Sequence, residues 1–417
     1  MNRIDIHSTN QFNWVLECGA KHFVHCRQLQ STGTDFSYVT FILDRTSLCA
    51  CRVKEVNVHT PVFPRCLWVL VVACMMVLGG CAEVKYNMRL DPEDRPPGTA
   101  KVWPAAPETP RYQYVGQLWG EDNLVAEDGN KQNLGTRIFS WIVGLFDGTE
   151  EKVTLKRPQS GAVDAQGRIY VTDVSNHAVF VFDQSLGKLL IWEMAQETRK
   201  FVTPIGIAAG AGASILVADA DLAQVFRLDL EGKPIGSFGK GILKRPTGLA
   251  RDAKRGRVYV ADTHAHDIKV FDDAGTLLEV MAQRGDGENE LNFPTHLAFG
   301  GDRLYVTDTM NARVQIFDAD GKNVGTLGKR GLYFGNLTRP KGVTVDSSGN
   351  VYVIESYYDN LLVFNQQGEF LLSIGGAGQQ VGEFYLPAGL WSDSRGRIYV
   401  ADMFNGRVVM FQFLGGT

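Results

Sequence analysis

The stretch YVTDTMNARVQIF, residues 305–317, contains two short runs rich in Val, Ile, Tyr and Phe around a polar turn. Related runs occur elsewhere, as RVYVAD at 257–262 and RIYVAD at 397–402, and Val-Phe pairs stand at 181–182, 270–271 and 363–364. Runs of β-branched and aromatic residues bounded by turn residues are typical of β-strands. We therefore expect two adjacent strands here, within a unit that the chain repeats.

A proline opens each repeat. It stands at positions 158, 204, 246, 294, 340 and 387, so the unit is about 46 residues long. A unit of this length has room for four short strands, which is the period of a propeller blade. No segment of blade length has the 3.6-residue period of a helical solenoid. The sequence thus predicts an all-β fold, a six-bladed β-propeller.

The two ends of the repeat region predict how the ring closes. The sixth unit, from Pro387, provides only three strands, whereas residues 112–118 form an additional strand-like run upstream of the first unit. An N-terminal strand that completes the last blade leaves no gap in the ring. We expect the propeller to cover residues 112–417, with residues 120–150 as an apolar insertion that contains a short helix.

The repeating unit resembles the NHL repeat. Residues 246–271 carry its motif, from the proline-x-glycine-leucine-alanine start to the Ile-x-Val-Phe strand, and residues 305–317 carry the second half in full. The likeness covers about residues 154–413. It extends to bacterial NHL-repeat lipoproteins and implies a propeller of the NHL or TolB-like type. Because propellers host many unrelated activities, the resemblance implies the fold and leaves the function open.

Composition and cysteine positions exclude several classes of function. The 417 residues are 44% hydrophobic and carry a net charge of −4, which is globular and lacks the basic excess of a nucleic-acid binder. All seven cysteines lie at or before Cys81, so the repeat region holds no disulfide, thiolate zinc site or cysteine nucleophile. The RING pattern of some animal NHL proteins is missing, and ubiquitin transfer is not expected.

The segment 61–81 reads as a lipoprotein signal peptide. Its apolar run at 67–80 follows Arg65 and is shorter than the 20 or so residues that span a bilayer. The run ends in Leu78-Gly79-Gly80-Cys81, which resembles the bacterial lipobox, so lipidation is expected at Cys81. This places the protein in a bacterial cell envelope, on the outer membrane in preference to the inner one. A buried apolar strand is the other interpretation.

Two further segments flank the signal. Residues 1–60 fit no part of a lipoprotein signal, and we interpret them as a non-native upstream extension, from a start codon placed too early, or as disordered. Residues 82–111 contain six of the 15 prolines and read as a Pro-rich tether.

Charged residues recur at fixed places in the repeats. The second predicted strand of each unit ends in an acid that is expected to accept backbone N–H groups: Asp173, Asp219, Asp262, Asp308, Glu355 and Asp402. Arg157, Arg245 and Arg339 precede the proline in alternate units, with Lys156, Lys244 and Lys341 beside them. These six bases are candidates for a collar that holds an anionic partner. The alternative is that each arginine pairs with a neighbouring strand-end acid.

His296 is the remaining candidate. It replaces a small residue at the second position after the repeat proline. Related six-bladed lyases and lactonases hold a catalytic metal in the channel on several converging side chains, but no second inward imidazole accompanies His296 in the sequence. We expect no cofactor, and a packing role for His296 is favoured over a channel metal ion.

The function predicted from the sequence is a lipid-anchored, non-enzymatic binding or scaffold module. One loop face would bind a protein or an anionic glycan partner, the membrane would be reached through the lipid, and nucleic acid is not expected as a partner. The alternative is a periplasmic metal-dependent lyase or lactonase with its site in the propeller channel.

Overall fold

The computed structural model describes residues 3–7, 13–18, 23–29, 38–42, 85–90, 101–126, 152–333 and 335–415. The chain divides into two units, residues 1–82 and 83–417. In the first unit, four strands form one antiparallel sheet in sequence order: β1 (Arg3–His7), β2 (Asn13–Cys18), β3 (Phe23–Leu29) and β4 (Tyr38–Ile42). The predicted signal run at 67–80 and Cys81 lie outside the described residues.

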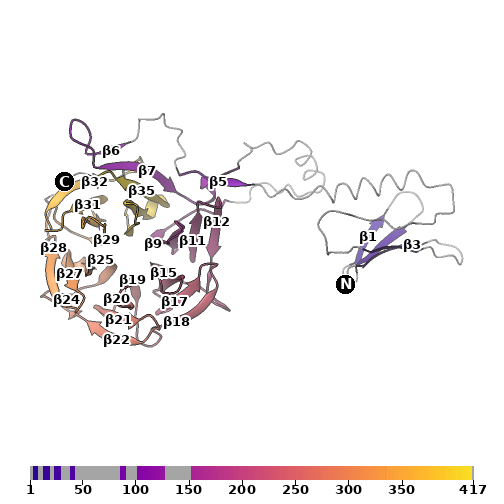
Figure 1. Cartoon of the computed structure of the whole chain (residues 1–417), viewed down its shortest axis with the longest axis horizontal. Helices are drawn as coiled ribbons and strands as arrows, with labels where there is room; N and C mark the ends of the chain where they lie inside the picture. Colours follow the sequence, from indigo (N-terminus) through magenta and orange to yellow (C-terminus); the bar gives the residue numbers. More distant parts are fainter. Residues whose placement is uncertain are drawn as a thin grey trace. The chain divides into compact units, whose positions relative to one another are not determined.

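The second unit is a six-bladed β-propeller, as predicted (Figure 1). Each of the first three blades is a four-stranded antiparallel sheet whose strands follow one another in sequence. Blade 1 is β9 (Pro158–Val163), β10 (Ile169–Asp173), β11 (Ala178–Asp183) and β12 (Lys188–Trp192). Blade 2 is β15 (Pro204–Ala209), β16 (Ser214–Asp219), β17 (Gln224–Asp229) and β18 (Pro234–Phe238). Blade 3 is β19 (Pro246–Asp252), β20 (Arg257–Asp262), β21 (Asp267–Asp272) and β22 (Leu277–Met281).

The next two blades repeat this order. In each of blades 1 to 5 the repeat proline begins the first strand, which is the inner one. Blade 4 is β25 (Pro294–Gly300), β26 (Arg303–Asp308), β27 (Arg313–Asp318) and β28 (Asn323–Leu327). Blade 5 is β29 (Pro340–Val345), β30 (Val351–Glu355), β31 (Asn360–Phe364) and β32 (Phe370–Gly375). Short strand pairs lie in two of the connections: β13 (Met194–Gln196) with β14 (Arg199–Lys200), and β23 (Gln283–Arg284) with β24 (Glu290–Leu291).

The last blade is built from both ends of this unit. It contains β33 (Leu390–Ser392), β34 (Arg397–Asp402) and β35 (Arg407–Phe413), and its next strand is β7 (Tyr112–Leu118). The predicted closing strand is therefore confirmed, with Val408 opposite Leu118 and Phe413 opposite Tyr112. A short strand, β6 (Val102–Trp103), adds a fifth strand to this sheet. Part of the predicted tether thus pairs with the propeller.

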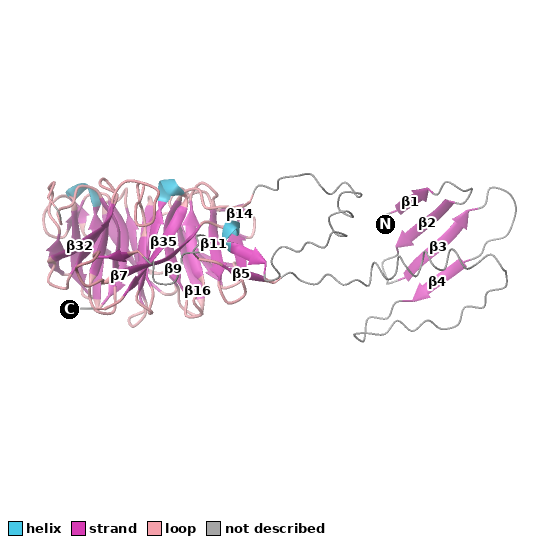
Figure 2. Ribbon diagram, turned by 90° about the horizontal axis from the view of Figure 1, so that it is seen from above, coloured by secondary structure: helices cyan, strands magenta, loops and turns pink. Residues whose placement is uncertain are grey.

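Apolar residues form six core layers, one between each pair of neighbouring blades. The second strands are buried along almost their whole length, since both faces of each sheet are covered. Large rings fill these layers; Tyr170, Tyr259, Tyr352 and Tyr399 occupy equivalent positions and are almost inaccessible to solvent. The edge view in Figure 2 shows the blades as a flat disc of strands with loops on both faces.

The described residues contain no α-helix. Three 3-10 turns occur, η1 (Glu121–Asn123), η2 (Thr309–Asn311) and η3 (Met403–Asn405), and β5 (Tyr86–Met88) pairs with β8 (Leu124–Ala126). Of the predicted insertion at 120–150, the start is thus a turn and a strand, and residues 127–151 lie outside the described part. No helix among the described residues has the length and apolarity to cross a membrane.

Candidate functional site

The acid at the end of each second strand is structural, as expected. In blade 1, Asp173 accepts the backbone N–H groups of Lys156 and Arg157 at 2.6 and 2.8 Å, and those of the following turn. Every blade repeats this bond to the loop that enters its own inner strand; the other acids are Asp219, Asp262, Asp308, Glu355 and Asp402. These carboxylates tie two loops of one blade together and are not free to bind a ligand.

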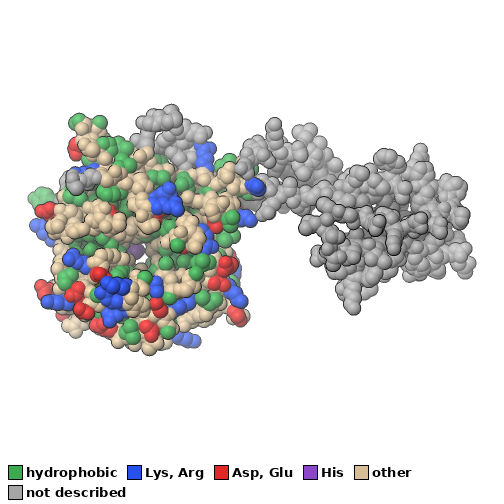
Figure 3. Space-filling model, viewed as in Figure 1, with side chains coloured by type: hydrophobic (Ala, Val, Ile, Leu, Met, Phe, Trp, Pro, Cys, Tyr) green, Lys and Arg blue, Asp and Glu red, His purple; other side chains and the backbone are tan. Residues whose placement is uncertain are grey.

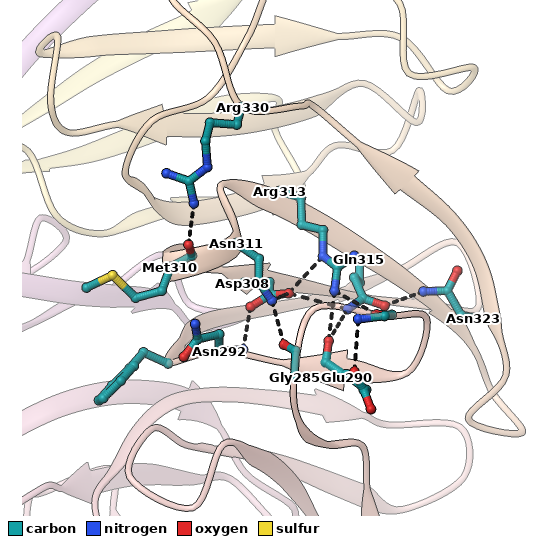
Figure 4. A network of polar contacts seen from close by, with 12 residues as sticks. Gly285, Glu290, Asn292, Asp308, Met310, Asn311, Arg313, Gln315, Asn323 and Arg330 are labelled. Carbon is teal, nitrogen blue, oxygen red and sulfur yellow. Dashed lines mark hydrogen bonds and ion pairs between the residues drawn. The ribbon is translucent and has the colours of Figure 1, made fainter.

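Blades 4 and 6 strengthen this tie with a largely buried arginine, shown for blade 4 in Figure 4. The Nε of Arg313 donates to Asp308 at 2.8 Å, Asn311 donates to the same carboxylate, and the other end of Arg313 donates to loop carbonyls. In blade 6, Arg407 binds Asp402 in the same way at 2.8 Å. This network is built from the sequence pattern Asp-x-x-Asn-x-Arg, which occurs at 308–313 and 402–407.

The turns between the second and third strands lie on the same face of the ring as the loops that enter the inner strands. A backbone hydrogen bond joins turn and loop: Ser356 N–H donates to the Arg339 carbonyl at 3.2 Å in blade 5, and Phe404 N–H donates to the Tyr385 carbonyl at 3.1 Å in blade 6. Val174 makes the same bond to Arg157. The predicted arginines therefore lie beside the turns between the second and third strands, on one face of the ring.

The three arginines do not form an even collar, and none of them pairs with a strand-end acid. Arg245 makes an ion pair with Asp221, with Nη1 and Oδ1 2.5 Å apart. The pKa of Asp221 is lowered mainly by the hydrogen bond from the Thr203 hydroxyl, and the Arg245 guanidinium lowers it further. Lys156 and Lys244 are exposed. Arg245 therefore differs from Arg157 and Arg339 in that its charge is paired with an acid.

Arg157 and Arg339 lie against aromatic rings. The guanidinium carbon of Arg157 is 5.8 Å from the centre of the Phe404 ring, and that of Arg339 is 5.9 Å from the Tyr357 ring. The Tyr385 ring is 5.5 Å from Phe404. Tyr357, Phe404 and Tyr385 remain 55%, 50% and 49% exposed. We call these five residues the aromatic–arginine patch; they belong to blades 5, 6 and 1.

His296 and Lys341 lie on the neighbouring inner strands β25 and β29. His296 is 8% exposed, and neither ring nitrogen has a hydrogen-bond partner among the described residues. Burial lowers the pKa of His296 to about 3; the ammonium of Lys341 adds to this, and the backbone of Gln159 in blade 1 partly offsets it. Burial also lowers the pKa of Lys341, and the positive charges of Arg339 and Arg157 lower it further. Figure 3, viewed along the ring axis, shows a hollow at the centre with histidine atoms in its wall.

No three His, Cys, Asp or Glu side chains come close enough together to hold a metal ion within the described ranges. The other histidines of the propeller, His177, His264 and His266, lie in turns; His266, for example, accepts the Phe293 N–H on Nδ1. A cleft of about 340 Å³ opens at blade 1, lined by Val153, Asn176, Phe180, Ile191, Glu193 and Met194. The aromatic–arginine patch, in contrast, offers both positive charge and exposed aromatic surface to a ligand.

Of the five patch residues, the two arginines were predicted from the sequence and the three rings were not. The repeat register identified both arginines, but their ring partners occur at turn positions where the other blades have different residues. Tyr357 follows the strand-end acid by two residues, and Phe404 does the same in blade 6. Aligning the turns after each acid would have revealed both rings.

Comparison with known proteins agrees with the fold. A family model described as a 6-bladed beta-propeller matches residues 338–417, and the NHL repeat model matches residues 155–182 and 243–271. The chain thus carries NHL repeats in a six-bladed β-propeller. A structural genomics protein of unknown function from Bacteroides thetaiotaomicron has a similar structure, with 14% identity and a TM-score of 0.51, over 64% of this chain and 71% of that one.

Two curated relatives are similar over part of the repeat region. Human NHL repeat-containing protein 2 is 30% identical over 146 residues, which is 32% of this chain and 20% of that protein. The human E3 ubiquitin-protein ligase NHLRC1 is 29% identical over 122 residues, 28% of this chain and 31% of that protein. The chain therefore spans less than a third of the length of either relative.

Proposed function

We propose that this six-bladed propeller of NHL repeats is a non-enzymatic binding module that presents the aromatic–arginine patch to a protein partner. The single observation that carries the proposal is the exposure of three aromatic rings next to Arg157 and Arg339, neither of which makes an ion pair with an acid of the described residues. Tyr, Phe and Arg are enriched at the centres of protein interfaces, whereas surface rings elsewhere on a soluble domain are scattered singly.

The scaffold supports this role. The strand-end acids and the buried Asp402–Arg407 pair hold the turns that carry the patch, so little conformational entropy is lost on binding. The guanidinium groups of Arg157 and Arg339 lie over rings, and an arginine stacked in this way can still donate its N–H groups to a partner. An acidic glycan is the second ligand that such a surface could take, and the experiment below separates the two.

We further propose that the module is lipid-anchored through Cys81 in a bacterial envelope, with the outer membrane as its site. The support is the order of features at 65–81, namely a basic residue, a short apolar run and the Leu-Gly-Gly-Cys end. A Cys81→Ser variant is expected to lose incorporation of a labelled fatty acid and to leave the membrane fraction. Labelling that persists in this variant would contradict the anchor.

Photo-crosslinking in the producing cell tests the partner. A photoreactive amino acid replaces Tyr357 or Phe404, and the control position is Gln367, in an exposed turn on the opposite face. We expect one common protein species to be captured from both patch positions, not from Gln367, and to be lost when Arg157 and Arg339 become Ala. A captured species that is sensitive to glycosidase and not to protease would assign the patch to a glycan. Equal capture from Gln367 would contradict the proposal.

A further inference from the structure

The inner strands approach one another closely around the channel. A Cβ on Gly389 would lie 2.0 Å from the Gln159 carbonyl oxygen, and one on Gly248 would lie 2.9 Å from the Cα of His296. Glycine or serine fills this position in the other five blades. In blade 4, a register shift between Pro294 and Leu297 takes His296 out of the ladder. Blades 2, 3 and 5 have an equivalent shift after the repeat proline, so what distinguishes blade 4 is the imidazole at this position.

His296 is a buried polar group without a partner. Both nitrogens are inaccessible to solvent and make no hydrogen bond to a described residue. One nitrogen of a neutral imidazole always carries a proton. The Gln159 backbone in blade 1 lies near enough to raise the pKa of the ring but makes no hydrogen bond of full geometry to it, so the N–H donor is available to a ligand. An unsatisfied buried donor costs about 1–3 kcal/mol, and a water, ion or ligand that accepts its hydrogen bond removes that cost.

Lys341 stands next to this donor, on the adjacent inner strand. It is half-buried, and its side chain makes no ion pair or hydrogen bond within the described ranges. The charges that act on it are all positive, from Arg339 in its own blade and Arg157 in blade 1. The strand-end acids of blades 1 and 5, Asp173 and Glu355, are bonded to backbone N–H groups. Among the described residues, the charges that act on Lys341 are thus those of two arginines and of no acid.

We propose that the mouth of the channel is a binding site for an oxyanion, a carboxylate or a phosphate group, held by Lys341 and His296 with Arg157 and Arg339 at its rim. Lys341 supplies a point charge, His296 a neutral N–H donor, and the arginines planar forks that suit paired oxygens. The site deepens the proposed function and rests on it for one step: the partner would insert an acidic group here. The site itself can be tested without any partner.

The test is calorimetric titration of the purified full-length chain with inorganic phosphate and, separately, with succinate, at low ionic strength. We expect saturable binding of at least one anion, weakened at least about tenfold by Lys341→Met, as the loss of a charge-assisted bond implies. The matched control is Lys233→Met, an exposed lysine in a turn on the opposite face, which should bind like the wild type. The anion that binds more tightly identifies the group as carboxylate or phosphate.

His296→Gly is the second variant. Glycine occupies the same position in four other blades, so this variant should fold, and we expect affinity to fall about fivefold with the loss of one hydrogen bond. No saturable binding to the wild type, or equal binding by the Lys341→Met and Lys233→Met variants, would overturn the site. Neither result would affect crosslinking at Tyr357 and Phe404, so failure of the site is distinguishable from failure of the partner proposal.

Discussion

The guanidinium of Arg157, at the start of blade 1, lies over the ring of Phe404 in blade 6. These residues are 247 positions apart in the sequence, and their contact crosses the seam where the propeller closes. The same seam is held from inside by Arg407, whose Nη1 donates to the Gln117 side chain of the closing strand at 3.0 Å. The proposed binding surface and the closure of the ring therefore meet in blade 6.

Replacing Arg157 and Arg339 together by Ala should weaken partner binding at least about tenfold, since interface arginines are frequent hot spots worth more than about 1 kcal/mol each. Lysine at both positions keeps the charge and loses the planar fork, so an intermediate affinity is expected. Crosslinking yield from position 357 measures both. Arg395→Ala, on the opposite face, is the control and should match the wild type.

Arg407→Leu should lower the free energy of unfolding by about 3–5 kcal/mol, because it leaves the carboxylate of Asp402 buried without its partner. Denaturant unfolding followed by tryptophan fluorescence measures the loss. Arg395→Ala should change stability by less than about 0.5 kcal/mol. If the two variants were equally stable, the pair would not hold the seam.

Leu118→Ala should lower the free energy of unfolding by about 2–5 kcal/mol, since Leu118 is fully buried in the core layer between blades 6 and 1. The same measurement on Leu278→Ala provides the comparison, because Leu278 is 53% exposed on an outer strand. A loss at Leu118 no greater than at Leu278 would contradict the closing role of β7.

His296 should make the folded protein less stable in acid. Its pKa is near 3 when folded and near 6.5 when unfolded, so the unfolded chain binds the additional proton between these values. Stability should therefore fall as pH decreases from about 6.5, by up to about 1.4 kcal/mol per pH unit relative to His296→Gly, and the difference should level off near pH 3. Denaturant midpoints across this range measure it. Parallel pH profiles for the two proteins would mean that the imidazole remains solvated.

The blades could be predicted because each one repeats the same short sequence pattern of a proline, turn residues and strand-like runs. The prolines at 158, 204, 246, 294 and 340 begin the inner strands as expected, and residues 112–118 close the ring. The sequence did not predict that residues 102–103 extend the last sheet, since two residues have no period. Pairing of this kind depends on which edge is left open once the ring has formed.

The site was predicted in part, for a physical reason. Repeat register places Arg157, Arg245 and Arg339 on one face but treats them as equivalent. What separates them is a non-repeated neighbour, Asp221 beside Arg245 and a ring beside each of the others. Register also marked His296 as unusual, whereas its missing hydrogen bonds became apparent only when the channel was formed.

Closure by a strand from the far end of the unit has a consequence for the protein's synthesis. Blade 6 requires residues 112–118 together with residues 390–413, so the early strand can pair with β35 only after residues 407–413 have left the ribosome. Domains generally fold as units. Since the patch joins Arg157 to Phe404, a chain that ends before blade 6 would lack Tyr385 and Phe404, and with them the part of the surface around Arg157.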